Sequence, residues 1–350
     1  MAAIQTLGVV SCLGGPMRYC GFAAEMLRDL FNESLNKLTP LMVRQAHYKR
    51  NQPLTVRPEP VEGLNQRFFK LQKQNRLQLQ WHMLYPESQG SKEDKLVNLN
   101  KAISQFTEDW TQAYQPFLVV GGDHSCAMGT WGGVLNSLRE PDQFGLIWLD
   151  AHMDAHTFAT SPSGNVHGMP VAALLGKADR KLAALYPSSH FVYAANFILI
   201  GIRNYEQEEY GLLKQAGVKI VFANQMNGIV SALIKAIDYL SQKCQTIGIS
   251  IDLDAIDPTD APGVETPVCG GIKAKELLAA LSLINRHPKV CGLEISEFTP
   301  EHDVNNLTLH LMKALIEAFY GELERPPVSS KPNKFLGSIS SGIKGKAVPS

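Results

Sequence analysis

The chain has 350 residues, of which 45% are hydrophobic, so it can bury one large α/β core or two ordinary ones. Its 33 Lys and Arg residues balance its 33 Asp and Glu residues, which excludes a whole-protein charge that would attract nucleic acid or an anionic membrane. The sequence holds no run of eighteen apolar residues, so we predict no transmembrane helix.

Short apolar runs predict strands, and apolar residues spaced three and four apart predict helices. We expect strands at residues 4–10, 117–120, 145–149, 197–201, 218–222, 246–251 and 290–295. We expect helices at residues 21–34, 95–115, 169–186, 228–242, 273–286 and 304–322, and a further helix that ends at Leu138. This alternation is typical of an α/β fold with a parallel sheet and helices on both faces.

Since no linker rich in Pro, Gly or Ser divides the chain, we interpret residues 1–323 as one domain. Residues 44–76 carry eight Lys and Arg against Glu59 and Glu62, which indicates a solvated insertion. A nucleic-acid-binding patch is the alternative, but the stretch shows no clear aromatic spacing for base stacking. Residues 324–350 are rich in Pro, Ser, Gly and Lys and are expected to form a flexible tail. The six cysteines include no C-x-x-C pair, so we expect buried free thiols and, in the absence of a signal-like N-terminus, a cytoplasmic protein.

Acids and histidines follow three of the predicted strands at the point where each strand ends. They are His124 after residues 117–120, Asp150, His152 and Asp154 after residues 145–149, and Asp252 and Asp254 after residues 246–251. Alternate residues of an extended backbone point to one side, and the carboxyl ends of parallel strands share one edge of the sheet. We therefore expect the six side chains to meet on three neighbouring strands. Because four clustered carboxylates repel one another, a divalent metal is expected among them.

Two histidines and four aspartates exceed one ordinary coordination shell. They suit two ions roughly 3.5–4 Å apart with two bridging aspartates. Carboxylates with imidazole and no thiolate favour Mn²⁺ over Zn²⁺. A water held between two such ions loses a proton near neutral pH and becomes a nucleophile, so the residues predict metal-activated hydrolysis. His167 is placed to donate a proton to a leaving amine, and Glu297 to hold a cationic carbon centre.

Other interpretations are open on the residues alone. The acids after residues 145–149 could form a polar turn, His167 could be held by backbone contacts, and Glu297 could be a surface acid. A regulatory or structural protein derived from a metallohydrolase would lack at least one ligand, whereas all six are present here. A two-metal phosphoesterase would use the same ligands, but the sequence has no Gly-rich phosphate loop with Lys or Arg.

The three motifs together resemble the ureohydrolases, the group of arginase, agmatinase, guanidinobutyrase and formimidoylglutamase. They are Gly-Gly-Asp-His-Ser at 121–125, Asp-Ala-His-Met-Asp at 150–154 and Ser-Ile-Asp-Leu-Asp-Ala-Ile-Asp-Pro at 250–258. The resemblance implies a three-layer α/β/α fold, two Mn²⁺ per subunit and a homo-trimer or homo-hexamer. It implies that one ion is held by His124, Asp150, Asp154 and Asp252, and the other by Asp150, His152, Asp252 and Asp254. Asp150 and Asp252 would then bridge, and Asp154 would also take part in catalysis.

The loop at residues 163–168 resembles that of arginases, which implies hydrolysis of L-arginine to L-ornithine and urea by a metal-bridging hydroxide. The resemblance assigns the proton shuttle to His167 and the guanidinium end of the substrate to Glu297 and Thr266. It assigns the amino-acid end to Ser163, Asn165, His156, Glu206 and Glu209. Two of these depart from the usual pattern, since His156 replaces an asparagine and Glu206 an aspartate. Formiminoglutamate, guanidinobutyrate and agmatine are therefore the alternative substrates.

Overall fold

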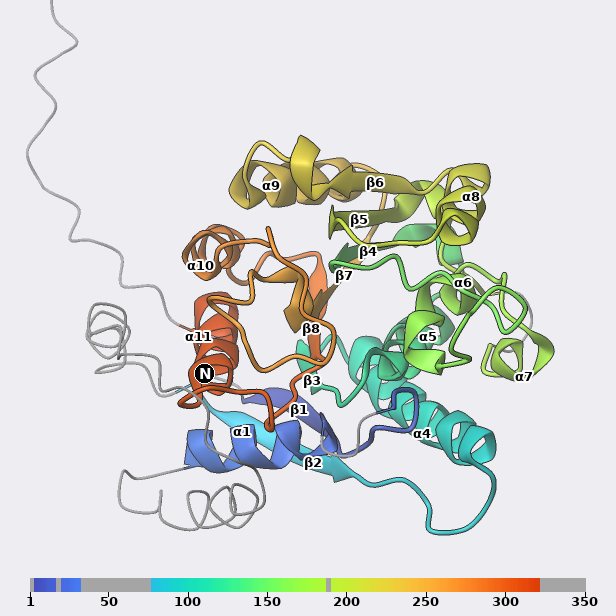
Figure 1. Cartoon of the computed structure of the whole chain (residues 1–350), viewed down its shortest axis with the longest axis horizontal. Helices are drawn as coiled ribbons and strands as arrows, with labels where there is room; N and C mark the ends of the chain where they lie inside the picture. The colour runs from blue at the N-terminus through green and yellow to red at the C-terminus, as the bar shows by residue number, and fades with distance from the viewer. Residues whose placement is uncertain (1–2, 17–19, 33–76, 187–189, 322–350) are drawn as a thin grey trace, which may run out of the picture.

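The structure is a computed structural model that describes residues 3–16, 20–32, 77–186 and 190–321 (Figure 1). The eight strands of these residues form one sheet in the order β2-β1-β3-β8-β7-β4-β5-β6, and each neighbouring pair is parallel. The strands are β1 (Ile4–Val9), β2 (Leu79–Leu84), β3 (Phe117–Val120), β4 (Phe144–Leu149), β5 (Phe197–Ile202), β6 (Lys219–Phe222), β7 (Thr246–Asp252) and β8 (Val290–Ser296).

Helices cover both faces of the sheet, as Figure 1 shows, with one group on the left of the strands and the other on the right. The left group consists of α1 (Ala23–Asn32), α9 (Ile229–Ser241), α10 (Ala274–Leu283) and α11 (Leu307–Tyr320). The right group consists of α4 (Lys92–Gln112), α5 (Ala127–Ser137), α6 (Pro170–Leu174), α7 (Arg180–Ala183) and α8 (Gln207–Ala216). The expected three-layer α/β/α fold is therefore confirmed.

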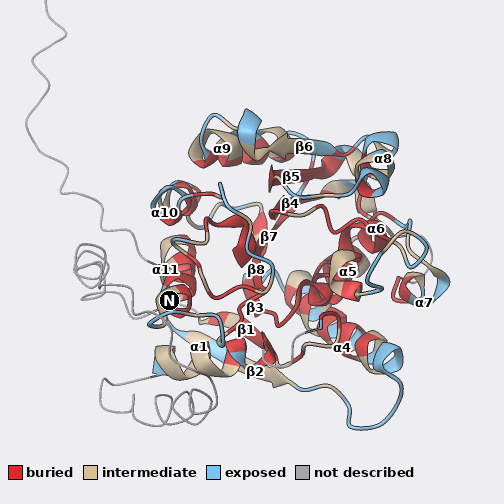
Figure 2. Ribbon diagram, in the orientation of Figure 1, coloured by how far each residue is buried: buried red, intermediate tan, exposed pale blue. Residues whose placement is uncertain are grey.

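Each strand contributes to two separate hydrophobic cores because its side chains alternate between the faces of the sheet. In β3, Leu118 and Val120 pack in the core beneath α1, α9, α10 and α11, whereas Phe117 and Val119 pack in the core beneath α4 to α8. The buried residues run along the strands and the inward faces of the helices (Figure 2). Burial on both faces explains why the central strands read as continuous apolar runs.

Three local predictions differ from the structure. The helix expected at residues 169–186 is divided into α6 and α7, and Gly176 adopts a positive φ of 70° just after α6, a conformation that commonly follows a helix end. Strand β2 and helix α8 were not predicted. The interpretations of residues 44–76 and 324–350 lie outside the described residues.

The cysteines also differ from the expectation of free thiols. Cys12 and Cys20 form a disulfide with their Cα atoms 5.7 Å apart. Among the described residues, free thiols are left at Cys126, Cys244, Cys269 and Cys291. None of the described helices combines the length and the apolar character that crossing a membrane requires.

The strand order decides where the polar side chains meet. We expected β3, β4 and β7, which carry the predicted metal ligands, to be neighbouring strands. This prediction is wrong for β3, because β8 lies between β3 and β7. Since all strands run in one direction, the carboxyl ends of β3, β8, β7 and β4 nevertheless form one continuous stretch of the sheet edge. The insertion of β8 brings Glu297, which follows this strand, into the same group of side chains.

Candidate active site

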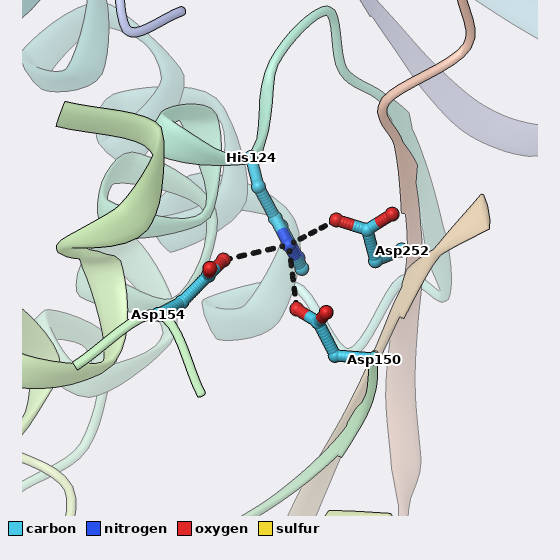
Figure 3. A group of neighbouring side chains, drawn as sticks. All are labelled: His124, Asp150, Asp154 and Asp252. Carbon is cyan, nitrogen blue, oxygen red and sulfur yellow. Dashed lines mark ion pairs between the residues drawn. The ribbon is translucent and has the colours of Figure 1, made fainter. Parts of the chain in front are cut away.

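The first group of side chains surrounds the imidazole of His124, in the turn that follows β3 (Figure 3). Its Nδ1 atom lies 3.3 Å from Oδ2 of Asp150, 3.2 Å from Oδ2 of Asp154 and 3.0 Å from Oδ2 of Asp252. All four residues are at most 7% exposed. The structure therefore brings together four of the six predicted ligands, from three different strand ends, with one atom of each directed to a common centre.

A second group adjoins the first through Asp150. The Nδ1 atom of His152 lies 3.0 Å from Oδ2 of Asp254 and 3.6 Å from Oδ1 of Asp150. The two oxygens of Asp150 thus face different histidines, as a bridging carboxylate requires. Asp252 falls only into the first group, where its Oδ1 atom accepts a hydrogen bond of 2.8 Å from the backbone N–H of Asp254.

Charge explains why this arrangement suits a cation. Burial, followed by repulsion from Asp254 and Asp150, raises the pKa of Asp252 well above its usual value. Burial and the charge of Asp150 likewise raise the pKa of Asp154 to about 7. In His124, Nδ1 has no hydrogen-bond partner among the described residues, although it is buried against three carboxylates. An unpaired imidazole nitrogen among crowded carboxylate oxygens fits one or more divalent metal ions.

Behind the first group, a buried hydrogen-bond chain fixes the orientation of His124. Its Nε2 atom lies 3.0 Å from Oγ of Ser250, and the Ser250 hydroxyl donates to Oε2 of Glu294 at 2.6 Å. Glu294 is fully buried in β8 and also accepts hydrogen bonds from Thr130 Oγ1 at 2.7 Å and Trp131 Nε1 at 3.0 Å. This chain places a proton on Nε2 and leaves Nδ1 free to bind a metal.

Trp148 and Asn204 contact three of the predicted ligands, His124, Asp150 and His152. The indole of Trp148 stacks on the His124 ring with centroids 4.0 Å apart and donates to Oδ2 of Asp150 at 2.8 Å. The Nδ2 atom of Asn204 lies 3.2 Å from Nε2 of His152. None of Ser250, Glu294 or Asn204 was predicted. An acid within the apolar run of β8 was the one signal that could have pointed to Glu294.

Two residues of the site have backbone conformations that side chains other than glycine rarely adopt. Asp154 has φ of 49° and Glu297 has φ of 67°. Such strain persists only where the surrounding structure enforces it, and it is frequent at functional sites. For Glu297 the enforcing contacts are its N–H bond to the carbonyl of Gly122, at 2.8 Å, and the bond of 2.6 Å that its Oε1 accepts from the His124 N–H.

His167 and Glu297 form an ion pair beside the cluster. The Nδ1 atom of His167 lies 3.3 Å from Oε1 of Glu297. Burial opposes the charge of His167, but the Glu297 carboxylate outweighs it and raises the pKa of His167 to about 10. Conversely, burial would raise the pKa of Glu297, but the hydrogen bond and charge of His167 lower it below its usual value. Both groups are therefore charged at neutral pH.

A cavity of about 230 Å³ opens from the cluster to solvent. Its lining contains His152, Asp154, His156, Ser163, Asn165, His167, Glu206, Glu209, Asp252, Asp254, Thr266 and Glu297. The predicted site residues that are missing from this lining are His124 and Asp150, which lie beneath it in the first group. Thr266 donates a hydrogen bond to Oδ2 of Asp254 at 2.9 Å, and Ser163 Oγ accepts one from the Asn165 N–H at 3.2 Å.

At the mouth of the cavity, the two residues that depart from the arginase pattern contact each other. The Nε2 atom of His156 lies 3.2 Å from Oε2 of Glu206 and 3.5 Å from Oε2 of Glu209. Its Nδ1 atom lies 3.1 Å from the hydroxyl of Thr160. Glu209 is buried, which raises its pKa to about 8, whereas the Glu206 side chain is 55% exposed. The mouth thus carries hydrogen-bond donors and carboxylates side by side.

Fold and site together define a class, the α/β proteins that gather side chains able to bind metal at the carboxyl edge of a parallel sheet. Comparisons with known proteins identify the family within this class. The model of the arginase family matches residues 38–321. The chain is 37% identical to the arginase of Brevibacillus brevis over 231 residues, which are 65% of this chain and 76% of that protein. It is also 37% identical to the arginase of Bacillus caldovelox over 207 residues, 59% of this chain and 68% of that protein.

Solved structures agree with this assignment. The crystal structure of arginase from Bacillus subtilis superposes with a TM-score of 0.72 and 27% sequence identity, covering 93% of this chain and 100% of the other. The chain belongs to the arginase family. As a member of this family, it is a hydrolase that acts on the C–N bonds of guanidino compounds.

Proposed function

We propose that this enzyme hydrolyses L-arginine to L-ornithine and urea with two Mn²⁺ ions. The observation that carries the proposal is how the burial of the lining groups changes across the cavity, from Asp254 and Glu297, which are 1% and 3% exposed, to Glu206, whose side chain is 55% exposed. Metal-binding carboxylates and Glu297 line its base, where a cationic guanidinium would lie, and donors and carboxylates are mixed at its mouth. A substrate with a guanidinium at one end, and an α-carboxylate and an α-ammonium at the other, matches this arrangement.

The clustered residues fit two divalent cations. His124, Asp150, Asp154 and Asp252 would hold one ion, and Asp150, His152 and Asp254 the other, with Asp150 shared. Asp252, which lies in the first group only, would be a further bridging ligand to the second ion by family resemblance. Two bound Mn²⁺ ions would lower the pKa of water and so supply a nucleophile at neutral pH. A carboxylate-rich donor set without thiolates supports Mn²⁺ as the metal.

Glu297 is suited to orient the guanidinium. Its Oε1 atom is engaged by His124 and His167, whereas its Oε2 atom is buried and has no hydrogen-bond partner among the described residues. Because Glu297 is ionised, Oε2 can accept a charge-assisted hydrogen bond from a guanidinium N–H. Leaving this buried oxygen unpaired is costly, which favours a cationic substrate over a neutral one.

His167 is suited to deliver a proton. It lies in the loop on the solvent side of the cavity and is protonated at neutral pH because Glu297 stabilises the charged imidazole. When the tetrahedral carbon centre collapses, the departing amine needs a proton, and His167 can donate one. The Glu297 carboxylate keeps the imidazole in place during this transfer.

The mouth of the cavity supports an α-amino acid as the substrate. His156 and Glu206 satisfy each other when no ligand is present. A substrate carboxylate would take the hydrogen bond of His156, and the neighbouring ammonium would pair with Glu206, so both partners of the opened pair remain satisfied. Agmatine lacks the carboxylate and guanidinobutyrate lacks the ammonium, so each would leave one partner unpaired.

The test is to incubate the Mn²⁺-loaded protein with arginine, agmatine, guanidinobutyrate and formiminoglutamate, and to measure urea or formamide. We expect kcat/KM to be highest for arginine. A higher value for any other compound would retain the metal chemistry and refute the substrate assignment. The proposal also includes a cytoplasmic location and a homo-trimer or homo-hexamer. Light scattering on the purified protein would test the oligomeric state, and cell fractionation the location.

A further inference from the structure

Beside the cavity, a third group of side chains contains a carboxylate to which the proposed mechanism gives no role. Val264 and Phe298 pair across an isolated antiparallel β-bridge, which holds their chain neighbours Glu265 and Glu297 close together. One potential ligand atom each from His167, Glu265 and Glu297 lie within 4.8 Å of one another. Glu265 is absent from the lining of the cavity and from both groups of predicted metal ligands.

Two buried carboxylate oxygens in this group lack partners. Oε2 of Glu265 and Oε2 of Glu297 are both inaccessible to solvent, and neither has a hydrogen-bond partner among the described residues. Glu297 is itself only 3% exposed. Buried polar atoms are almost always paired, so two carboxylate oxygens without partners near one imidazole indicate a missing positively charged ligand.

The charged groups around Glu265 also favour binding of a cation. Asp123, in the turn after β3, and Glu297, after β8, face Glu265, and His167 faces it from the loop after β4. On the α4 side, Lys92 Nζ is hydrogen-bonded to the carbonyl of Gly15 at 3.3 Å. Burial, and then repulsion from Glu297, raises the pKa of Glu265 to about 7. One imidazolium thus compensates three neighbouring carboxyl groups only in part.

We propose that His167, Glu265 and Glu297 form a third divalent-cation site, distinct from the two-metal cluster, and that Zn²⁺ bound there inhibits the enzyme. Imidazole nitrogen and carboxylate oxygen are both Zn²⁺ ligands, and water would take the fourth position. Ligand atoms on a tetrahedral Zn²⁺ at about 2.1 Å lie about 3.4 Å apart, so side-chain shifts of up to about 1.4 Å close the site.

Inhibition follows from the identity of two of the ligands. A cation held by Glu297 neutralises the carboxylate proposed to receive the guanidinium, and binding to His167 requires the neutral imidazole, so one proton is released to solvent. Zn²⁺ therefore removes the substrate anchor and the proton donor together. The inhibitory part of this inference rests on the proposed function, whereas the binding of Zn²⁺ does not.

The experiment starts with protein loaded with two Mn²⁺ per chain and freed of excess metal. ZnCl₂ is titrated by calorimetry, and the Mn and Zn contents are measured after gel filtration. We expect one additional Zn²⁺ per wild-type chain with both Mn²⁺ retained. Glu265→Gln removes one of the three ligands and should weaken Zn²⁺ binding by at least about 100-fold, more than the 10–100-fold typical of losing an outer partner.

Matched variants separate this site from its alternatives. Glu206→Gln alters the other histidine–glutamate group, at the mouth of the cavity, and should bind Zn²⁺ as the wild type does. Glu265→Gln should keep the uninhibited activity towards whichever guanidino compound is the best substrate, and should require at least tenfold more Zn²⁺ for half-inhibition. Thermal unfolding of all variants would reveal a folding defect. If Glu265→Gln is unstable, Glu265→Ala provides a second variant without the carboxylate.

Several outcomes would overturn the proposal. They are equal Zn²⁺ binding by wild type and Glu265→Gln, loss of binding in Glu206→Gln alone, and release of one Mn²⁺ for each Zn²⁺ taken up. If arginine proves not to be the substrate, the Zn²⁺ stoichiometry still tests the site, since it is measured without substrate.

Discussion

Removal of a single oxygen atom behind the metal cluster tests how His124 is held. In Ser250→Ala, the Nε2 atom of a histidine that is 1% exposed loses its contact to Ser250 Oγ at 3.0 Å. A buried donor left without a partner costs about 1–3 kcal/mol, and losing an outer partner of a metal ligand typically lowers metal affinity 10–100-fold. The two figures agree, because tenfold in affinity corresponds to about 1.4 kcal/mol.

We therefore expect the Kd for Mn²⁺ to rise 10–100-fold in Ser250→Ala, measured by calorimetric titration of the metal-free protein. Thr130→Val is the matched control, since Thr130 also donates to Glu294 but does not contact His124. This control should lower the free energy of unfolding and change the Kd for Mn²⁺ by less than about threefold. A wild-type Kd in Ser250→Ala, or an equal loss of affinity in Thr130→Val, would refute the role of the hydrogen-bond chain.

Four further predictions follow from the site. Asp150→Asn should abolish metal binding and activity together, because the carboxylate that faces both histidines loses its charge; full metal content by elemental analysis would refute the bridging role. His167→Ala should keep the metal and lose about 10²–10⁴-fold in kcat, the usual share of a general acid, and an unchanged kcat would exclude His167 as the proton donor. In the metal-free protein, the ion pair raises the pKa of His167 from 6.5 to about 10, so its contribution to stability is complete below pH 6.5 and is lost as the pH rises through about 10. The difference in unfolding free energy between wild type and His167→Ala should therefore shrink over that range, and a constant difference would contradict the pairing with Glu297. Glu206→Gln should reduce the kcat/KM ratio of arginine over guanidinobutyrate about fivefold to tenfold, since a half-exposed charge contact contributes roughly 1 kcal/mol, and an unchanged ratio would show that Glu206 does not contact the ammonium.

The cluster of histidines and aspartates could be predicted from the sequence because its side chains follow buried strands, after β4 and β7 at alternate positions. Asp150, His152 and Asp154 illustrate this, since the apolar run before them identifies the strand and strand geometry supplies the rest. The position of β8 could not be predicted, because strand order in a parallel sheet is set by packing between distant segments rather than by local pattern. Glu297 was therefore assigned from its place after a strand and from family resemblance, without its neighbours.

Residues behind the cluster escaped prediction for a related reason. Ser250 and Glu294 lie on adjacent strands, and only the pairing of β7 with β8, which sets these two residues opposite each other, shows that they meet. The edge strand β2 alternates polar and apolar residues and is only partly buried, so its pattern is weak. Helix α8 begins at a capping box formed by Glu206 and Glu209, and glutamate is an unusual residue to start a helix.

The place of β8 in the sheet also has a consequence for how the chain folds. The backbone N–H of His124 reaches the side chain of Glu297 across 173 positions of sequence, and β8, among the last segments of the domain, separates β3 from β7. Contacts between such distant segments form slowly, because a long stretch of chain must be ordered before they stabilise anything. The two halves of the cluster can therefore come together only after β8 has inserted between them. In a refolding experiment, metal uptake should follow the last kinetic phase, and a chain released before β8 is synthesised should bind no metal at this edge.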